Sequence, residues 1–198
     1  MLTPGLHAVP PGKVATVVTH LEMTARPEAR PDHVPEDIQI VTAEAPTPDW
    51  FRALFRRVGQ DWLWFSSLQL SDAALSAILD DPDIRIWSVR KGGEDLGLLE
   101  LDFRTEGACE LAFFGLAPPL IGTGAGRALM NRAIAEAWAA PITRFHVHTC
   151  TLDSPQALAF YIRSGFNPVR QEVEIADDPR LTGDLPPEAA PQIPVFHP

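Results

Sequence analysis

The sequence predicts an α/β fold in which helices cover the faces of a mixed β-sheet. Three observations support this prediction. Strand-like and helix-like stretches alternate along most of the 198 residues, and a glycine-rich turn joins one strand-like run to the next helix-like run. Fourteen of the 20 prolines lie in residues 1–48 and 177–198, so we expect the regular fold between these ends.

The length favours one folded domain with proline-rich ends. We expect an N-terminal arm over residues 1–37, a folded domain over residues 38–176, and a C-terminal tail over residues 177–198. The arm contains one expected strand, because residues 14–19 form a run rich in β-branched side chains.

The first half of the expected domain begins with Ile-Gln-Ile-Val at residues 38–41, which predicts a strand. Thr47, Pro48 and Asp49 then predict a helix start, because proline fits the first turn and an acidic residue there complements the helix dipole. Apolar residues at helical spacing follow. Ser71 is the expected N-cap of a second helix, which runs to residue 79.

Alternating apolar and polar residues predict the next strand at residues 84–90. The sequence Lys-Gly-Gly-Glu at residues 91–94 predicts a tight hairpin turn, since glycine adopts the positive φ angles that such turns require. The hairpin leads into an expected strand at residues 96–104, and another strand is expected at residues 109–116.

The second half of the domain follows the glycine-rich turn. We expect a helix over residues 124–139 and a strand over residues 145–149. With the strand before the turn, these elements predict a right-handed parallel crossover. A helix over residues 155–163 and a strand over residues 169–175 complete the expected order.

Charge and composition limit the partners that we expect. Acidic residues outnumber basic ones 26 to 16, for a net charge of −10, which argues against a nucleic-acid partner. No apolar run approaches the ~18 residues of a membrane span, and no secretory signal is visible. Cys109 and Cys150 form no metal-binding pattern, so we expect a cytoplasmic protein with reduced thiols, without bound metal or membrane. A homodimer is left open.

The glycine-rich turn contains Gly122, Gly124 and Gly126 directly before the expected helix. Glycine lets the backbone approach a ligand closely, and the start of a helix attracts negative charge. These properties predict a pyrophosphate site. A Walker loop is excluded because no Gly-Lys-Ser/Thr is present, and a dinucleotide fingerprint fails because Arg127 replaces its third glycine. The alternative is a tight connection without a ligand.

These features resemble the GNAT superfamily of acyl-CoA-dependent N-acetyltransferases. Its members carry V/L-x-P and [QR]-x-x-G-x-[GA] between a strand and a helix, and later a tyrosine just before Gly-Phe. In this chain the motif residues are Leu116, Pro118, Ile121, Gly124, Gly126, Tyr161, Gly165 and Phe166. The resemblance covers about residues 38–176. It departs from the family at Ile121, where members carry Gln or Arg.

The resemblance implies that acetyl-CoA is the acyl donor. It assigns the pantetheine arm to the backbone of Phe114, Gly115 and Leu116, and to Ser154, where members often carry Asn. It assigns the pyrophosphate to the amides of Gly122, Thr123, Gly124, Ala125, Gly126 and Arg127.

Two catalytic roles also follow from the resemblance. Tyr161, the only tyrosine in the chain, would act as the general acid that protonates the leaving thiolate. The N–H of Leu116 would stabilise the oxyanion. The alternative for Tyr161 is a structural role in which its ring packs and its hydroxyl bonds a backbone carbonyl.

Glu110 is the favoured general base, because histone-acetylating members carry their base at the same distance from the glycine motif. Strand alternation would place it on one face with Phe114 and Leu116, where partial burial would raise its pKa. The alternative is a solvent-exposed or arginine-paired carboxylate. His148 is the second candidate for the base and ranks above His146, although both could be core histidines.

Trp62 and Trp64 lie between the two expected N-terminal helices, in the region that shapes the acceptor pocket in this superfamily. They could stack on an apolar or cationic acceptor, or they could anchor the helices to the sheet. We therefore expect an N-acetyltransferase that acts by direct transfer on a primary amine of a small molecule or peptide. A covalent route through Cys150 has no support. The competing hypothesis is a non-catalytic acyl-CoA sensor.

Overall fold

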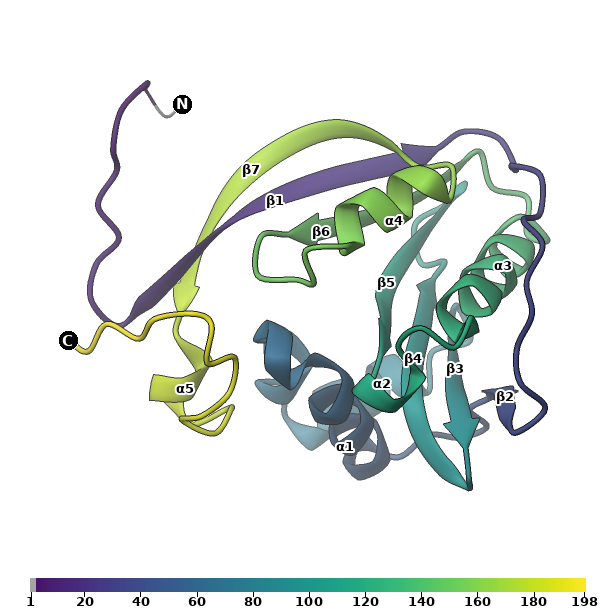
Figure 1. Cartoon of the computed structure of the whole chain (residues 1–198), viewed down its shortest axis with the longest axis horizontal. Coiled ribbons are helices and arrows are strands. Elements are labelled where there is room, and N and C mark those ends of the chain that lie inside the picture. The colour runs from purple at the N-terminus through teal and green to yellow at the C-terminus, as the bar shows by residue number, and fades with distance from the viewer. Residues whose placement is uncertain (1–2) are drawn as a thin grey trace.

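The computed structural model describes residues 3–198 and contains one mixed sheet with helices on its faces (Figure 1). The strands are β1 (Lys13–Met23), β2 (Ile38–Thr42), β3 (Ile84–Lys91), β4 (Glu94–Asp102), β5 (Ala108–Leu116), β6 (Arg144–Cys150) and β7 (Asn167–Asp177). The helices are α1 (Pro48–Gly59), α2 (Asp72–Leu79), α3 (Ala125–Ala137), α4 (Ala157–Arg163) and α5 (Pro179–Thr182). The seven strands lie in the order β2-β3-β4-β5-β6-β1-β7, which confirms the predicted fold class.

The predicted helix starts agree with the observed caps. The Thr47 hydroxyl accepts a hydrogen bond from the N–H of Trp50, and the Ser71 hydroxyl accepts one from the N–H of Ala74. These contacts satisfy N–H groups that have no partner inside their helices. The segment between α1 and α2 contains two short 3-10 turns, at Gln60–Trp62 and Ser66–Leu68.

Two apolar layers hold the helices on opposite faces of the sheet. One layer lies between the sheet and α3, and the other lies under α1 and α2. The first layer includes the fully buried residues Leu99, Leu101, Leu111, Leu129 and Phe145. The second includes Phe51, Leu54, Phe55, Leu75 and Leu98.

Strand β1 enters the interior of the sheet from the N-terminal part of the chain. It pairs antiparallel with β6 on one side and with β7 on the other, and it is longer than the strand predicted at residues 14–19. The sheet therefore extends beyond the expected domain boundary at residue 37. The division of the chain into an arm, a domain and a tail stays a prediction.

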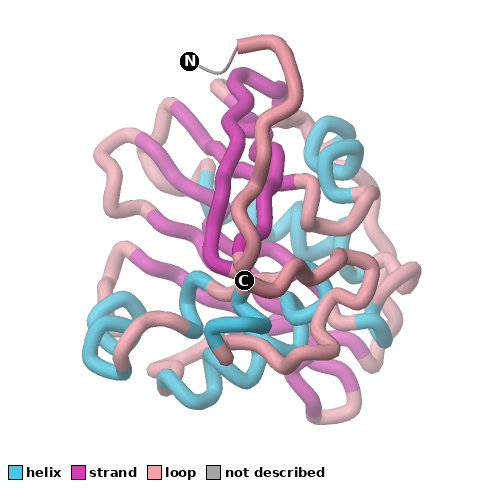
Figure 2. The backbone as a smooth tube through the Cα atoms, turned by 90° about the vertical axis from the view of Figure 1, so that its left-hand side faces the viewer, coloured by secondary structure: helices cyan, strands magenta, loops and turns pink. Residues whose placement is uncertain are grey.

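The proline-rich C-terminal tail packs beside the start of β1, near Val14, on the side of the molecule that faces the viewer in Figure 2. Asp178 and Arg180 form an ion pair whose side chains are both only 2% exposed. Arg180 also donates hydrogen bonds to the carbonyls of Ala189, Ala190 and Ile193. The Arg180 guanidinium therefore holds the turns that follow α5 in place. The sequence did not predict α5.

Candidate functional site

Strands β5 and β6 run parallel but separate toward their carboxyl ends. Their register contains only three pairs, the last of which joins Glu110 to His146, although β5 continues to Leu116. On the other edge of β5, the N–H of Ala117 donates to the carbonyl of Leu96 at 2.7 Å. Because hydrogen-bonding direction alternates along a strand, the peptide groups of Leu116 and Phe114 point toward the opening cleft. A ligand could pair with this free edge as another strand would.

Gly115 has a steric role in this cleft. Alternation turns its peptide groups toward β4, so the backbone pairing that we expected from Gly115 itself does not fit this register. A Cβ atom at this position would lie 2.4 Å from Val58 and 3.0 Å from Trp64. The absence of a side chain therefore lets α1 and Trp64 pack directly against β5.

The glycine turn offers fewer free amides than the six predicted. The N–H of Thr123 bonds the Leu120 carbonyl, that of Ala125 bonds the Thr123 hydroxyl, and that of Arg127 bonds the Gly124 carbonyl. Within residues 3–198, the amides of three turn residues have no hydrogen-bond partner. These residues are Gly122, Gly124 and Gly126, at the start of α3. Free amides at a helix start form a suitable site for a pyrophosphate.

The N-terminal arm lies against this turn. Arg127 donates a hydrogen bond to the Pro31 carbonyl at 3.1 Å, and Asn131 donates one to the Arg30 carbonyl at 2.7 Å. A Cβ atom on Gly124, whose φ is +93°, would lie 2.3 Å from the His33 carbonyl oxygen. Glycine is thus required at position 124 by its backbone conformation and by the close approach of the arm.

Tyr161 lies on α4 at the edge of the cleft, with only 6% of its surface exposed. Its ring packs edge-on against Phe114, Phe160 and Phe166. Its hydroxyl makes no hydrogen bond within residues 3–198, so the backbone bond of the structural alternative is absent there. Burial raises the pKa of the Tyr161 hydroxyl, which keeps it protonated at neutral pH. A neutral hydroxyl in this position can donate a proton.

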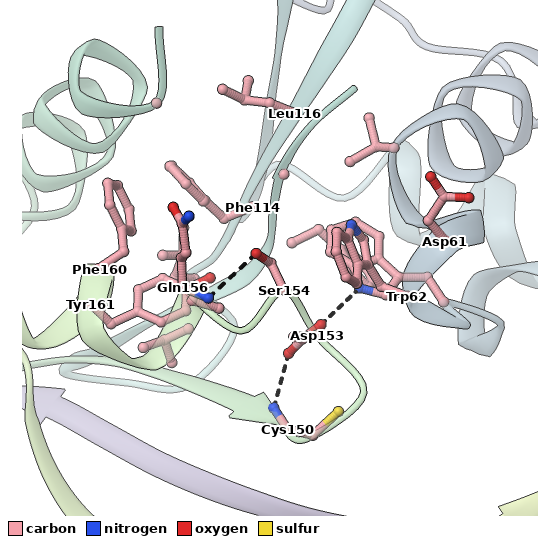
Figure 3. Close-up of a pocket in the computed structure, with 18 of the residues that line it drawn as sticks. Asp61, Trp62, Phe114, Leu116, Cys150, Asp153, Ser154, Gln156, Phe160 and Tyr161 are labelled. Atoms are coloured by element: carbon pink, nitrogen blue, oxygen red, sulfur yellow. Dashed lines mark hydrogen bonds between the residues drawn. The ribbon is translucent and has the colours of Figure 1, made fainter. Parts of the chain in front are cut away.

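The loop after β6 connects the two sides of the cleft (Figure 3). Asp153 accepts hydrogen bonds from the Thr149 hydroxyl, the Cys150 N–H and the indole N–H of Trp64. The next residue, Ser154, lines the same cavity, and its hydroxyl accepts a bond from the N–H of Gln156 at 3.4 Å. Asp153 is therefore a positioning residue, because it holds the loop after β6 against Trp64.

A β-bulge changes the expected arrangement of Glu110. In the β4–β5 register, Leu101 faces Leu111 and Glu100 faces Phe113, so Ala112 is an extra residue. The side chains of Leu111 and Phe113 consequently pack into different apolar layers. Our expectation that Glu110 shares a face with Phe114 and Leu116 was wrong, because a bulge reverses the alternation.

Glu110 and His148 instead meet on the sheet face opposite α3. Glu110 Oε1 lies 3.3 Å from His148 Nδ1, and the His148 side chain is 52% exposed and lines the cavity. The hydrogen bond from His148 lowers the pKa of Glu110, which corrects our expectation of a raised value, and the same bond raises the pKa of His148. His148 is therefore not a core histidine.

The two tryptophans occupy different surroundings. Trp64 packs against Phe55 and Phe113 and against the backbone of Gly115, as expected of an anchor, while one edge reaches the cavity. Trp62 lines the cavity near Asp61 (Figure 3), and within residues 3–198 its indole N–H has no hydrogen-bond partner. Trp62 is the better placed of the two to contact an acceptor.

One cavity of about 870 Å³ joins these parts. It extends from the glycine turn along the free edge of β5 to Tyr161, His148 and Cys150. Burial raises the pKa of the Cys150 thiol, so this group is not a ready nucleophile. Within residues 3–198, no group of three or more His, Cys, Asp or Glu side chains is arranged to hold a metal ion.

A family model described as the acetyltransferase (GNAT) family matches residues 42–166, which is more than half of the chain. The chain belongs to the GNAT family. This assignment agrees with the parallel crossover, the glycine turn and Tyr161 in the order that the sequence motif requires. No curated protein sequence matches this GNAT chain.

Solved structures share the GNAT fold at low sequence identity. A GCN5-related N-acetyltransferase from Sphaerobacter thermophilus has a TM-score of 0.57 and 15% identity, covering 86% of this chain and 53% of that one. A GNAT acetyltransferase from Elizabethkingia anophelis with acetyl-CoA bound has a TM-score of 0.52 and 18% identity, covering 69% of this chain and 80% of that one. An aminoglycoside acetyltransferase from an uncultured soil metagenomic sample, in complex with trehalose, has a TM-score of 0.55 and 14% identity, covering 67% of this chain and 90% of that one. This GNAT chain thus spans about half the length of the Sphaerobacter protein. In the described residues, no helix is long and apolar enough to span a membrane.

Proposed function

We propose that this protein is an N-acetyltransferase that uses acetyl-CoA to acetylate a primary amine of a small molecule or peptide in the cytoplasm. The supporting observation is the single cavity in which the free edge of β5, the three free glycine amides and the Tyr161 hydroxyl meet. These groups match a long ligand with a polar amide arm and a pyrophosphate. When bound, acetyl-CoA supplies an activated acyl group as its thioester.

The proposed chemistry assigns the base to His148 and gives Glu110 a positioning role. His148 lines the cavity, and its Nδ1 is held by Glu110, so Nε2 is left to accept the proton of the attacking amine. The N–H of Leu116 would donate a hydrogen bond to the oxyanion, and Tyr161 would give its proton to the leaving sulfur. The new carbon–nitrogen bond replaces the carbon–sulfur bond without an acyl-enzyme.

A second candidate is a non-catalytic acyl-CoA sensor of the same fold. The observation that favours it is Ile121, whose exposed apolar side chain stands in the glycine turn where the family motif carries Gln or Arg. Both candidates bind acetyl-CoA, so binding alone does not separate them.

Release of free CoA thiol in the presence of a panel of primary amines tests the proposal. We expect thiol release that depends on an amine, yields one acetylated product per thiol, and falls strongly in Tyr161→Phe. Acetyl-CoA binding without amine-dependent release for any member of a broad panel would favour the sensor. Absence of binding would contradict both candidates.

A further inference from the structure

Strand β7 is an unusually open edge of the sheet. It has 11 residues, none of them buried, and among residues 3–198 it pairs only with β1 (Figure 1). The opposite edge is β2, which has only five residues. A long edge strand presents a row of unpaired N–H and C=O groups that can pair with another chain.

The two faces of β7 differ in chemistry. On one face, Val173 and Ile175 are 50% and 52% exposed, and Val173 lies opposite the exposed Val17 of β1. On the other face, Arg170, Glu172 and Glu174 follow one another in alternate positions. An added strand would place its own side chains beside Val173 and Ile175 on one face and beside this row of charges on the other.

The charge row of β7 can pair with a copy of itself across an antiparallel two-fold axis. Glu172 is the middle residue of Asn167–Asp177, so a two-fold axis at Glu172 pairs the whole strand with its copy. This register sets Arg170 of each copy opposite Glu174 of the other, which forms two ion pairs across the strands. The two Glu172 side chains meet on the axis, where each is already paired with Arg170 and His20 of its own chain. A register centred on Val173 instead sets Glu172 opposite Glu174 twice and forms no ion pair, and such like charges repel. A register centred on Gln171 sets Arg170 opposite Glu172 but leaves residues 176 and 177 of each strand unpaired.

We propose that two copies of this protein associate through antiparallel pairing of their β7 strands, centred on Glu172, into one continuous sheet. The partner is a second copy because the strand matches its own sequence in charge and length. The interface is isologous, as a two-fold axis requires. Glu174 also lines the cavity, so Arg170 of the other copy would lie beside the acceptor side of the site.

Charge reversal tests both the interface and its register. Sedimentation equilibrium of the full chain should give twice the 21.7 kDa chain mass. Arg170→Glu and Glu174→Arg should each be monomeric, because each places like charges opposite one another. An equimolar mixture of the two variants should form a heterodimer, since both opposed pairs are then attractive. Arg132→Glu, on exposed α3 surface away from β7, is the matched control and should remain dimeric.

A cysteine cross-link gives a second measurement that does not depend on charge. Glu172→Cys should form a disulfide-linked dimer under mild oxidation, because position 172 meets its own copy on the axis. The unmodified chain, which contains only Cys109 and Cys150, is the control and should not cross-link. A monomeric wild type at 100 µM would overturn the proposal. The proposal would also be overturned if Arg170→Glu and Glu174→Arg each stayed dimeric. It would be overturned as well if these two variants did not associate when mixed.

Discussion

Trp64 Nε1 lies 3.2 Å from Asp153 Oδ1, and this hydrogen bond links the segment after α1 to the loop after β6. The bond spans the cavity between its acceptor side and its α4 side. We expect Trp64→Phe to lower the free energy of unfolding by about 1 kcal/mol and to raise the acceptor KM, because the loop is released. Denaturant unfolding and steady-state kinetics measure these effects. Trp62→Phe is the control for stability. If both variants lost the same free energy of unfolding, the hydrogen bond between Trp64 and Asp153 would have no stabilising role.

Tyr161→Phe removes the proposed acid while leaving the packed ring in place. We expect kcat to fall about 10²–10⁴-fold while the Kd for acetyl-CoA stays unchanged. Isothermal titration and single-turnover measurements separate these quantities. An unchanged kcat would restrict the Tyr161 hydroxyl to a structural role.

Glu110→Gln tests whether Glu110 acts through His148. The carboxylate raises the pKa of His148, so its removal should lower that pKa. Activity rises with pH as His148 loses its proton, and the acidic limb of the kcat/KM profile should therefore move to lower pH. His148→Ala should abolish this limb. If Glu110 itself were the base, Glu110→Gln would lose activity across the whole pH range.

Acetyl-CoA should stabilise the fold through the glycine turn. At 100 times its Kd, bound ligand adds about 2.7 kcal/mol to the free energy of unfolding, which thermal denaturation detects as a higher Tm. Gly124→Ala should lose this shift, because the backbone conformation and the His33 carbonyl leave no room for a Cβ atom. Gly92→Ala also introduces a Cβ at positive φ, but in open space at the β3–β4 turn, and should keep the shift. An equal ligand shift in both variants would contradict a site at Gly124.

Glu100 should make stability depend on pH. Burial raises the pKa of this carboxyl from 4.5 to about 8, and its Oε2 atom finds no hydrogen-bond partner in the part of the chain that the structure describes. Between these values the folded protein holds a proton that the unfolded chain releases, so stability falls as pH rises from 4.5 to about 8. Glu100→Gln should remove this part of the decline and be more stable than wild type at pH 9. Denaturant unfolding across this range measures it, with the exposed Glu106→Gln as control. If the free energy of unfolding fell equally with pH in wild type and in Glu100→Gln, the raised pKa of Glu100 would be contradicted.

Local patterns predicted most elements because local interactions specify them. The caps at Thr47 and Ser71 and the glycines of the turn act within a few residues, so the sequence contains the whole signal. The position of β1 was not predictable in this way. Its β-branched run indicated a strand, but its partners β6 and β7 lie more than a hundred residues away along the chain.

The site was predicted less completely than the fold. The motif located Tyr161 and the glycine turn, whereas the bulge at Ala112 depends on pairing with β4 and has no local sequence signal. That bulge separates Glu110 from Phe114 and leaves it beside His148. Cross-strand contacts of this kind require the register between β5 and β6.

The insertion of β1 between β6 and β7 has a consequence for synthesis on the ribosome. Lys13 donates a hydrogen bond to Asp177, which lies 164 residues later, so the first strand synthesised must wait for the last one. Until β6 and β7 have been synthesised, β1 has no strand to pair with, and the nascent chain exposes its aggregation-prone β-branched segment. Contacts so distant in sequence slow folding, because a long loop must close before they form. Premature termination anywhere before residue 167 therefore leaves β1 without β7, and we infer that such fragments depend on chaperones or are degraded.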